Sequence, residues 1–332
     1  MKNRLIYILG GVLIAQIIIF GLLSIDTHRV KEKVRFLSQD TSQVNYVKIR
    51  NKDGMVVLNR VGQNWRMTEP YNSPANPSYV KTLLEKLAGL ELESYITSNE
   101  DKYSQYEMTD TTAAYVEVGK EGGTIDKFWC GKPSDTYTHT YMRRDGSKEI
   151  WLVSGTPRSS LTRRPKDWRD KTVLTLDRTL VQRILLRHPA ETYELVREIG
   201  IEKDTLSGRP DTTWRVNPPK GASYKPETNV MNRILNTICK LNSTDIKDAG
   251  QDEIPAFDPV VFGVDVFLEG NQRHSIDFIQ DPSDDSRWLA RLDGNAQQAF
   301  VIYQSSVKNL MKKDDELKGG EKYENPQEKK RK

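Results

Sequence analysis

The hydrophobic positions divide the chain into an uncharged N-terminal stretch, two longer stretches of mixed periodicity and a charged C-terminus. The uncharged stretch is Leu5–Ile25. Two windows that open at Pro77 and Pro226 have apolar residues spaced three and four apart, which predicts an amphipathic helix in each. These residues are Val80, Leu83, Leu84, Leu87 and Leu90 in the first window, and Met231, Ile234, Leu235, Ile238 and Leu241 in the second.

Short runs with strand periodicity follow each predicted helix. In both sets an Asp-Gly turn, at Asp145 and Asp293, separates two strands. The predicted strands are Ala114–Val118, Thr124–Cys130, Thr138–Arg143 and Glu149–Val153 in the first set, and Val264–Glu269, Ser275–Ile279, Trp288–Leu292 and Ala299–Ile302 in the second.

A signature of Trp-Arg followed by two prolines occurs twice. The prolines follow each tryptophan at offsets of five and twelve residues. The signature residues are Trp65, Arg66, Pro70 and Pro77 in the first copy, and Trp214, Arg215, Pro219 and Pro226 in the second. A third Trp-Arg pair, at Trp168, lacks both prolines, so we interpret it as a coincidence.

The segments upstream of the signature also correspond. Both Val44–Arg60 and Val181–Arg197 read as a hairpin, and only the second copy carries a polar insertion, at residues 198–213, before its tryptophan. A surface insertion of this kind is tolerated because loop-closure entropy grows slowly with loop length.

These patterns predict an α+β fold: an N-terminal transmembrane helix followed by two tandem copies of a unit with an antiparallel sheet and one helix. The predicted boundaries are a cytoplasmic stub at 1–4, the span at 5–25, a juxtamembrane linker at 26–43, the repeats at 44–176 and 177–311, and a disordered charged tail at 312–332.

The signature has a structural interpretation and a functional one. In the first, the tryptophan packs under the helix, the first proline ends a strand and the second proline starts the helix. Full burial of so large a side chain stabilises a fold by roughly 2–3 kcal/mol. In the second, the Trp-Arg pair is exposed and binds a partner, since both types are common in binding hot spots.

The stretch Leu5–Ile25 is long enough to span a bilayer as a helix. Lys2 and Arg4 precede it, so the positive-inside rule places the N-terminus in the cytoplasm and the rest outside it. The alternative is a cleaved signal peptide. We therefore expect a single-pass protein of the bacterial inner membrane with a periplasmic or extracytoplasmic domain.

Composition narrows the function classes. The net charge of +4 is small for 332 residues and gives no reason to expect a nucleic-acid partner. The two cysteines, Cys130 and Cys239, are too few for a disulfide framework, and we interpret them as unpaired core thiols, with a disulfide as the alternative.

The sequence contains no recognisable catalytic, cofactor-binding or metal-binding motif. The acidic stretch Asp281–Arg287 lacks the glycine and distal glutamate of a calcium-binding loop, which favours a solvated turn. A basic cluster could contact lipid head groups or an acidic partner, or it could be an ordinary solvated linker. Its members are Arg158, Arg163, Arg164, Lys166, Arg169 and Lys171.

The signature, the leucine-rich helix, the Tyr-x-Arg-x-Asp-Gly hairpin and the segment "WRDKTVLTLD" together resemble a bacterial family, the domain of unknown function 4340. The resemblance covers about Val44–Ile302. It implies an N-terminal anchor, repeated copies of one unit, an extracytoplasmic location and genes beside gliding-motility-type ABC transporter components. It implies no catalytic residues.

We therefore expect a non-enzymatic binding or scaffold module without cofactors, an accessory subunit of an ABC-type transporter or envelope complex, with protein partners. The alternative is a cell-wall carbohydrate-binding protein or hydrolase that uses exposed aromatic residues, namely Tyr137, Tyr141, Trp151 and Trp288.

Overall fold

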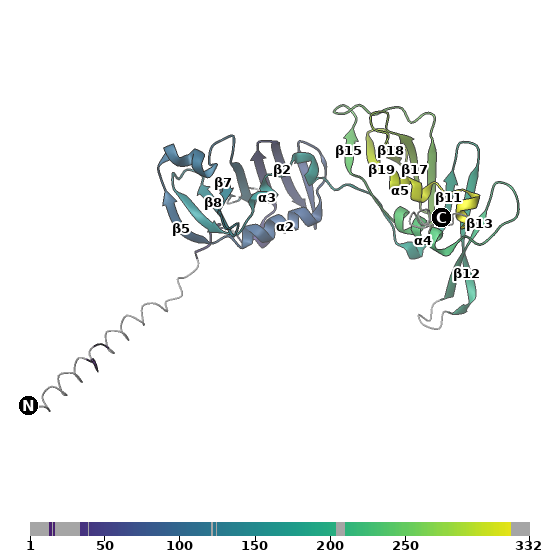
Figure 1. The fold of residues 1–332 in the computed structure, drawn as a ribbon, viewed down its shortest axis with the longest axis horizontal. Coiled ribbons are helices and arrows are strands. Elements are labelled where there is room, and N and C mark those ends of the chain that lie inside the picture. Colours follow the sequence, from purple (N-terminus) through teal and green to yellow (C-terminus); the bar gives the residue numbers. More distant parts are fainter. Residues whose placement is uncertain are drawn as a thin grey trace, which may run out of the picture. The chain divides into compact units, whose positions relative to one another are not determined.

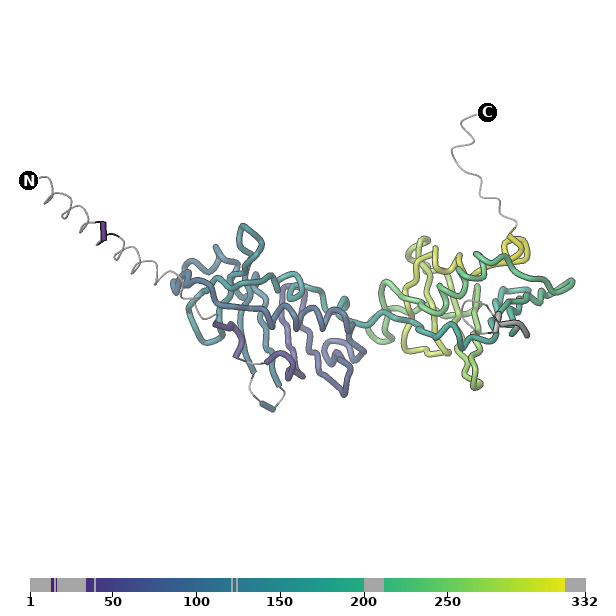
Figure 2. Tube along the Cα trace, turned by 90° about the horizontal axis from the view of Figure 1, so that it is seen from below, coloured from purple at the N-terminus to yellow at the C-terminus, as the bar shows by residue number. Residues whose placement is uncertain are grey.

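The structure is a computed structural model. It describes residues 34–319 except 39, 121, 124 and 204–209, together with residues 13, 14 and 16. The chain divides into two compact units, Met1–Arg169 and Asp170–Lys332 (Figure 1, Figure 2). Each unit has its own hydrophobic core.

The first unit contains a nine-stranded antiparallel sheet in the order β4-β3-β2-β1-β6-β7-β8-β9-β5. Its strands are β1 Tyr46–Asn51, β2 Gly54–Val61, β3 Asn64–Glu69, β4 Ser73–Pro74, β5 Leu92–Thr97, β6 Ala114–Gly119, β7 Ile125–Pro133, β8 His139–Arg144 and β9 Ile150–Ser154. Its helices are α2 Pro77–Ala88 and α3 Arg158–Leu161, with 3-10 turns η1 Thr41–Gln43, η2 Glu100–Tyr106 and η3 Pro165–Trp168.

The second unit contains an eight-stranded sheet in the order β13-β12-β11-β16-β17-β18-β19-β15 and a small sheet of β10 and β14. Its strands are β10 Thr172–Thr175, β11 Val181–Arg187, β12 Thr192–Lys203, β13 Pro210–Asn217, β14 Lys240–Asn242, β15 Asp245–Asp248, β16 Phe262–Leu268, β17 Arg273–Gln280, β18 Arg287–Leu292 and β19 Gln298–Tyr303. Its helices are α4 Thr228–Ile238, α5 Gln304–Leu310 and α6 Asp314–Leu317, with the turn η4 Arg178–Leu180.

The two large sheets have the same strand order once β1–β3 are matched with β11–β13 and β5–β9 with β15–β19. The register agrees as well, because Arg60 lies opposite Trp65 and Arg197 lies opposite Trp214. The predicted α+β class with antiparallel sheets is therefore confirmed.

The two main helices present equivalent apolar faces to the cores. Asn76 caps α2 by accepting from the backbone N–H groups of Ser78 and Tyr79, and Glu227 caps α4 by accepting from Val230. Val80, Leu83 and Leu87 are buried on α2, and Met231, Ile234, Leu235 and Ile238 are buried on α4, as the periodicity predicts.

The second proline has different roles in the two copies. Pro77 is the first residue of α2, as predicted, whereas Pro226 precedes the N-cap Glu227 and does not start α4. The loop before it is longer in the second unit: Met67 pairs with Ser73, whereas the equivalent Val216 pairs with Tyr224. Pro77 and Pro226 therefore share the offset of twelve residues from their tryptophans by coincidence.

Each sheet buries apolar residues on both faces, because neighbouring strand residues point to opposite sides. In the second unit Phe278 belongs to the main core under the helices, whereas Ile279 belongs to a smaller cluster with Phe257. In the first unit Phe128 and Trp129 divide in the same way between the main core and a smaller aromatic cluster.

Three predicted boundaries differ from the structure. Phe36 and Leu37, assigned to the linker at 26–43, are core residues of the first unit. Strand β10, assigned to the end of the first repeat, pairs with β14 in the second unit. Leu317, assigned to the tail at 312–332, is fully buried. In each case a short apolar segment finds a partner that is distant in sequence, which local pattern cannot indicate.

The predicted span at 5–25 lies outside the described residues, apart from Leu13, Ile14 and Gln16. Within the part of the chain that the structure describes, no helix has the length and apolar character needed to cross a membrane.

Candidate functional site

The signature tryptophans occupy equivalent, half-buried positions. Trp65 on β3 and Trp214 on β13 each pack against the main core of their own unit. Arg66 is exposed and donates from Nε to Asn72 Oδ1 at 2.7 Å, and Arg215 is exposed and lies 3.2 Å from Glu198. The tryptophan therefore contributes to packing, whereas the arginine makes local contacts at the surface.

The four signature prolines lie between the strand that carries the tryptophan and the following helix, or at the start of that helix. Pro70 and Pro219 are exposed in the loops that follow β3 and β13, and Pro77 is exposed at the start of α2. Pro226 is buried and lines a pocket beside Trp214.

This pocket is the strongest candidate site in the second unit. It has a volume of about 370 Å³ and lies between η4, the β12–β13 hairpin and α4. Its apolar wall is formed by Trp214, Pro226, Met231 and Leu235, its neutral polar lining by Thr179, Thr212, Thr213, Thr228 and Asn232, and its cationic lining by Arg178, Arg197 and Lys225.

Neutral groups hold the two arginines in place. The Arg178 guanidinium donates to the side-chain oxygens of Asn232 (2.5 Å) and Asn236 (3.3 Å) on α4. Arg197 on β12 donates from Nη1 to the carbonyl of Thr179. Among the described residues that line the pocket, none is an aspartate or a glutamate. The lining therefore concentrates positive charge.

Two carboxylates that neighbour the lining in sequence cap helices. Asp177 Oδ1 accepts from the backbone N–H of Thr179 at 2.8 Å and from its hydroxyl at 2.7 Å. Glu227 Oε2 accepts from the Val230 N–H at 2.7 Å, and hydrogen bonds from the N–H groups of Asn229 and Val230 lower the pKa of Glu227. Both carboxylates are held by residues next to them in sequence, and neither lines the pocket.

The predicted basic cluster does not present all its members at the surface. Arg158 is held by Glu107 and by the carbonyls of Thr112 and Cys130. Arg169 is only 2 % exposed, with its guanidinium 4.6 Å from the centroid of the Tyr71 ring. Burial therefore removes Arg169 from any contact surface.

The remaining basic residues divide between three places. Arg163 stacks on the Tyr79 ring, 3.7 Å from its centroid. Arg164 and Lys166 line a second pocket of about 510 Å³ together with Pro70. Lys171 belongs to the second unit.

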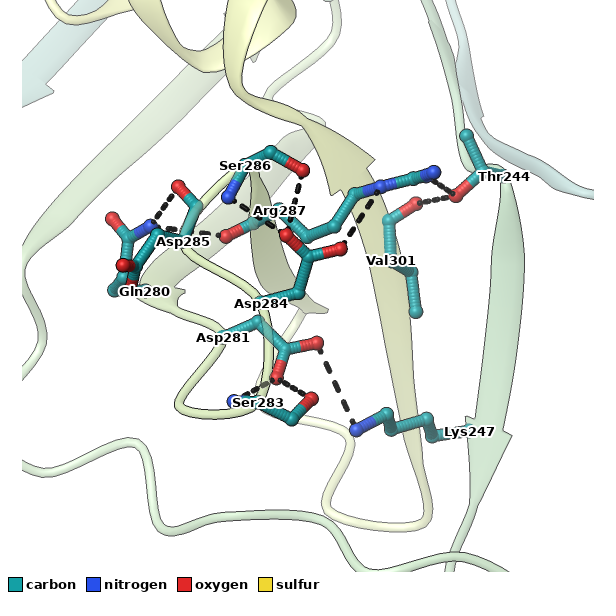
Figure 3. Close-up of polar contacts among 10 residues, drawn as sticks. All are labelled: Thr244, Lys247, Gln280, Asp281, Ser283, Asp284, Asp285, Ser286, Arg287 and Val301. Atoms are coloured by element: carbon teal, nitrogen blue, oxygen red, sulfur yellow. Dashed lines mark hydrogen bonds and ion pairs between the residues drawn. The ribbon is translucent and has the colours of Figure 1, made fainter.

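The acidic stretch Asp281–Arg287 is a structured turn (Figure 3). Asp281 is only 3 % exposed, and its Oδ1 accepts from the N–H and the hydroxyl of Ser283 at 2.9 and 2.6 Å. Its Oδ2 lies 3.8 Å from Lys247 Nζ. The prediction of a solvated turn is therefore wrong for Asp281, because these contacts compensate its burial.

The polar side chains of Asp284 and Arg287, in the second half of this turn, also have partners within the protein. Asp284 Oδ1 accepts from the N–H and the hydroxyl of Ser286, which lowers the Asp284 pKa (Figure 3). Arg287 lies 3.7 Å from Asp284 and donates to Thr244 Oγ1 at 2.7 Å. In the described part of the chain, no group of three or more His, Cys, Asp or Glu residues has an arrangement suited to a metal ion.

Both cysteines are free and buried, and they lie in different units. Burial raises the pKa of the Cys130 thiol to about 12, and burial also raises the pKa of Cys239. Both thiols therefore stay protonated near neutral pH, as suits core packing.

Sequence reasoning missed the three cations of the pocket. Arg178, Arg197 and Lys225 are distant in sequence and belong to no motif. The available signal was the polar insertion at residues 198–213, because Thr212 and Thr213 at its end line the pocket and only the second copy carries it.

The fold and the site define a sheet-rich α+β protein of two similarly built units, one of which has a cationic pocket. Residues 65–258 match the family described as Domain of unknown function (DUF4340), and the chain belongs to this family. Comparisons with curated proteins and with solved structures find no match.

Proposed function

We propose that the protein is a non-enzymatic binding and scaffold module, anchored in the bacterial cytoplasmic membrane by a helix over Leu5–Ile25. In this proposal both units lie on the extracytoplasmic side and serve as an accessory subunit of an ABC-type transporter or envelope complex. The carrying observation is that a single strand order is used twice after one uncharged stretch of spanning length.

Duplication of an ancestral unit accounts for the shared register around Trp65 and Trp214. A duplicated sheet offers two comparable surfaces on one chain, which suits simultaneous contacts within a complex. Such a role requires surfaces and pockets that bind partners, and it does not require a set of catalytic residues.

Purification of the full chain from membranes of its native host, in mild detergent, tests this proposal. We expect transmembrane or ATP-hydrolysing subunits of a transporter to copurify at low salt. The control is a chain in which residues 1–33 are replaced by a cleavable export signal, which we expect in the periplasmic fraction. Recovery of the full chain alone at both low and high salt would contradict the proposal.

The carbohydrate-binding alternative is less well supported. Of the four aromatic residues it invokes, only Tyr137 is well exposed, at 74 %, whereas Trp288 is 8 % exposed. Tyr141 and Trp151 are half-buried. These four side chains therefore offer little exposed ring surface for stacking on sugars.

A further inference from the structure

We propose that the pocket beside Trp214 binds a phosphate ester, with the phosphate among Arg178, Arg197 and Lys225 and the organic group against Trp214. This inference is drawn from the described pocket alone and does not depend on membrane anchoring or on a transporter partner.

Charge is the first argument. Three cationic side chains line one pocket of about 370 Å³, and its described lining contains no acidic residue. Because Arg178 and Arg197 are held by amides and a carbonyl, their hydrogen-bond partners do not neutralise them. A phosphate monoester, with a charge of about −1.5 to −2 at pH 7, matches this excess better than a monoanion does.

Preorganisation is the second argument. Asn232 and Asn236 fix the Arg178 guanidinium against α4, and the Thr179 carbonyl fixes Arg197. A positioned guanidinium donates paired N–H groups to phosphate oxygens at a lower entropic cost than a free one does. Lys225, which is exposed in the loop before α4, adds a third donor.

The apolar wall is the third argument. Trp214 is half-buried, and Pro226, Met231 and Leu235 are buried beside it. A ligand that is anionic at one end and planar or apolar at the other would use both linings. Pockets of about 300–1,000 Å³ commonly hold small organic ligands.

The matched positions of the first unit reproduce the cationic lining only in part. Strand register and caps match Arg178 with Thr41, Thr179 with Ser42 and Arg197 with Arg60. In the first unit Arg60 donates to Gln63 at 3.3 Å, in the tight turn between β2 and β3. The second hairpin is longer, since β12 has 12 residues and β2 has 8, and this extension supplies Thr212 and Thr213.

The test is titration calorimetry of the full chain in a neutral detergent with phenyl phosphate, inorganic phosphate and phenol as probes. We expect phenyl phosphate to bind most tightly, and its affinity to fall with added salt because the contacts are ionic. Lys225→Gln and Arg178→Gln should each weaken phenyl phosphate binding about tenfold, the effect of losing one charge-assisted hydrogen bond.

Two variants serve as controls. Lys220 is an exposed residue of the same loop as Lys225 but does not line the pocket, so Lys220→Gln removes a nearby charge only. Arg60→Gln alters the first-unit counterpart of Arg197. Both should bind phenyl phosphate as the wild type does. Circular dichroism verifies folding, and Lys225→Gln keeps the test valid should Arg178→Gln unfold.

Vesicles distinguish two sources of the phosphate. Preference for vesicles containing phosphatidic acid over neutral vesicles, lost in Lys225→Gln, assigns a lipid headgroup. Binding of phenyl phosphate without that preference assigns a soluble ester. No binding of phenyl phosphate at millimolar concentration, equal binding of phenol, or equal weakening in Lys220→Gln would overturn the proposal.

Discussion

Each large sheet has an outer face, the one that points away from the main core under the helices. On this face two arginines at equivalent strand positions flank one central residue, and this central residue differs between the units. In the first unit Arg50 and Arg143 lie 5.6 and 5.3 Å from the Trp129 ring centroid. In the second unit, Arg187 and Arg291 donate to the Asp277 carboxylate at 2.9 and 3.0 Å. One scaffold therefore accepts either cation–π contacts or ion pairs at this position.

A glycine accompanies the change. The Trp129 ring has Tyr115 at 4.8 Å between centroids, whereas the strand position of Tyr115 is taken by Gly263 in the second unit. A Cβ at Gly263 would lie 2.5 Å from the Arg187 guanidinium carbon. The missing side chain gives Arg187 room to reach Asp277 and Asp265.

The two units therefore share their core and their strand order, whereas the outer face of the sheet and the pocket differ between them. Stability should consequently respond to different perturbations in the two units. The following predictions use each unit as the reference for the other, with hydrogen exchange of β1 and β11 reporting the free energy of unfolding of each unit.

The largest expected effect is at Trp168, a fully buried side chain in the core of the first unit. Trp168→Ala should lower the stability of the first unit by about 3–5 kcal/mol. Trp214→Ala, at a half-buried site of the second unit, should cost clearly less. Equal losses from the two variants would show that the burial of Trp168 is not what stabilises the first unit.

The second effect is at Asp277, which is 17 % exposed between two arginines. Asp277→Asn should destabilise the second unit by roughly 2–3 kcal/mol, because Arg291 loses its charged partner and Arg187 keeps only Asp265. Trp129→Phe, which keeps a ring between Arg50 and Arg143, should cost the first unit less. A neutral outcome for Asp277→Asn would refute the importance of the ion pairs.

The third effect is the pH dependence of the stability that Asp277 gives the second unit. Burial alone would raise the pKa of Asp277, but hydrogen bonds from Arg187 and Arg291 outweigh burial and lower it. The folded state therefore gains stability from Asp277 above its usual pKa of about 3.9, and this gain is lost as pH falls through the depressed value. Urea unfolding should show a difference between wild type and Asp277→Asn that persists at pH 5 and shrinks at pH 3. A constant difference would contradict the assignment.

The smallest effects are expected at the signature arginines. Arg66 and Arg215 are exposed and make surface contacts. Each alanine substitution should change stability by less than about 0.5 kcal/mol. A larger loss of stability for either variant would show that the arginine, like the tryptophan, contributes to the stability of its unit.

Periodicity predicted the elements whose information is local. The apolar stripes of α2 and α4, the hairpin at Asp145 and the repeat around the two signature tryptophans all follow from spacing along one strand or helix. The burial of Trp168 and Leu317 depends on contacts between distant segments. The same reasoning therefore treated the Trp-Arg pair at Trp168 as a coincidence and assigned Leu317 to the tail.

The pocket was beyond sequence reasoning for the same reason. Arg178, Arg197 and Lys225 converge only because η4, β12 and the loop before α4 meet beside Trp214. The offset of Pro226 was misleading, because a longer loop moved it from the helix start into the pocket lining.

Hydrogen exchange of the full chain with and without phenyl phosphate tests most directly the claim that two units of one construction differ in binding. The account predicts protection in Arg178–Leu180, 212–217 and 225–235 of the second unit. It predicts no protection in Thr41–Gln43 or Pro77–Ala88 of the first. Equal protection of both units, or of neither, would contradict it.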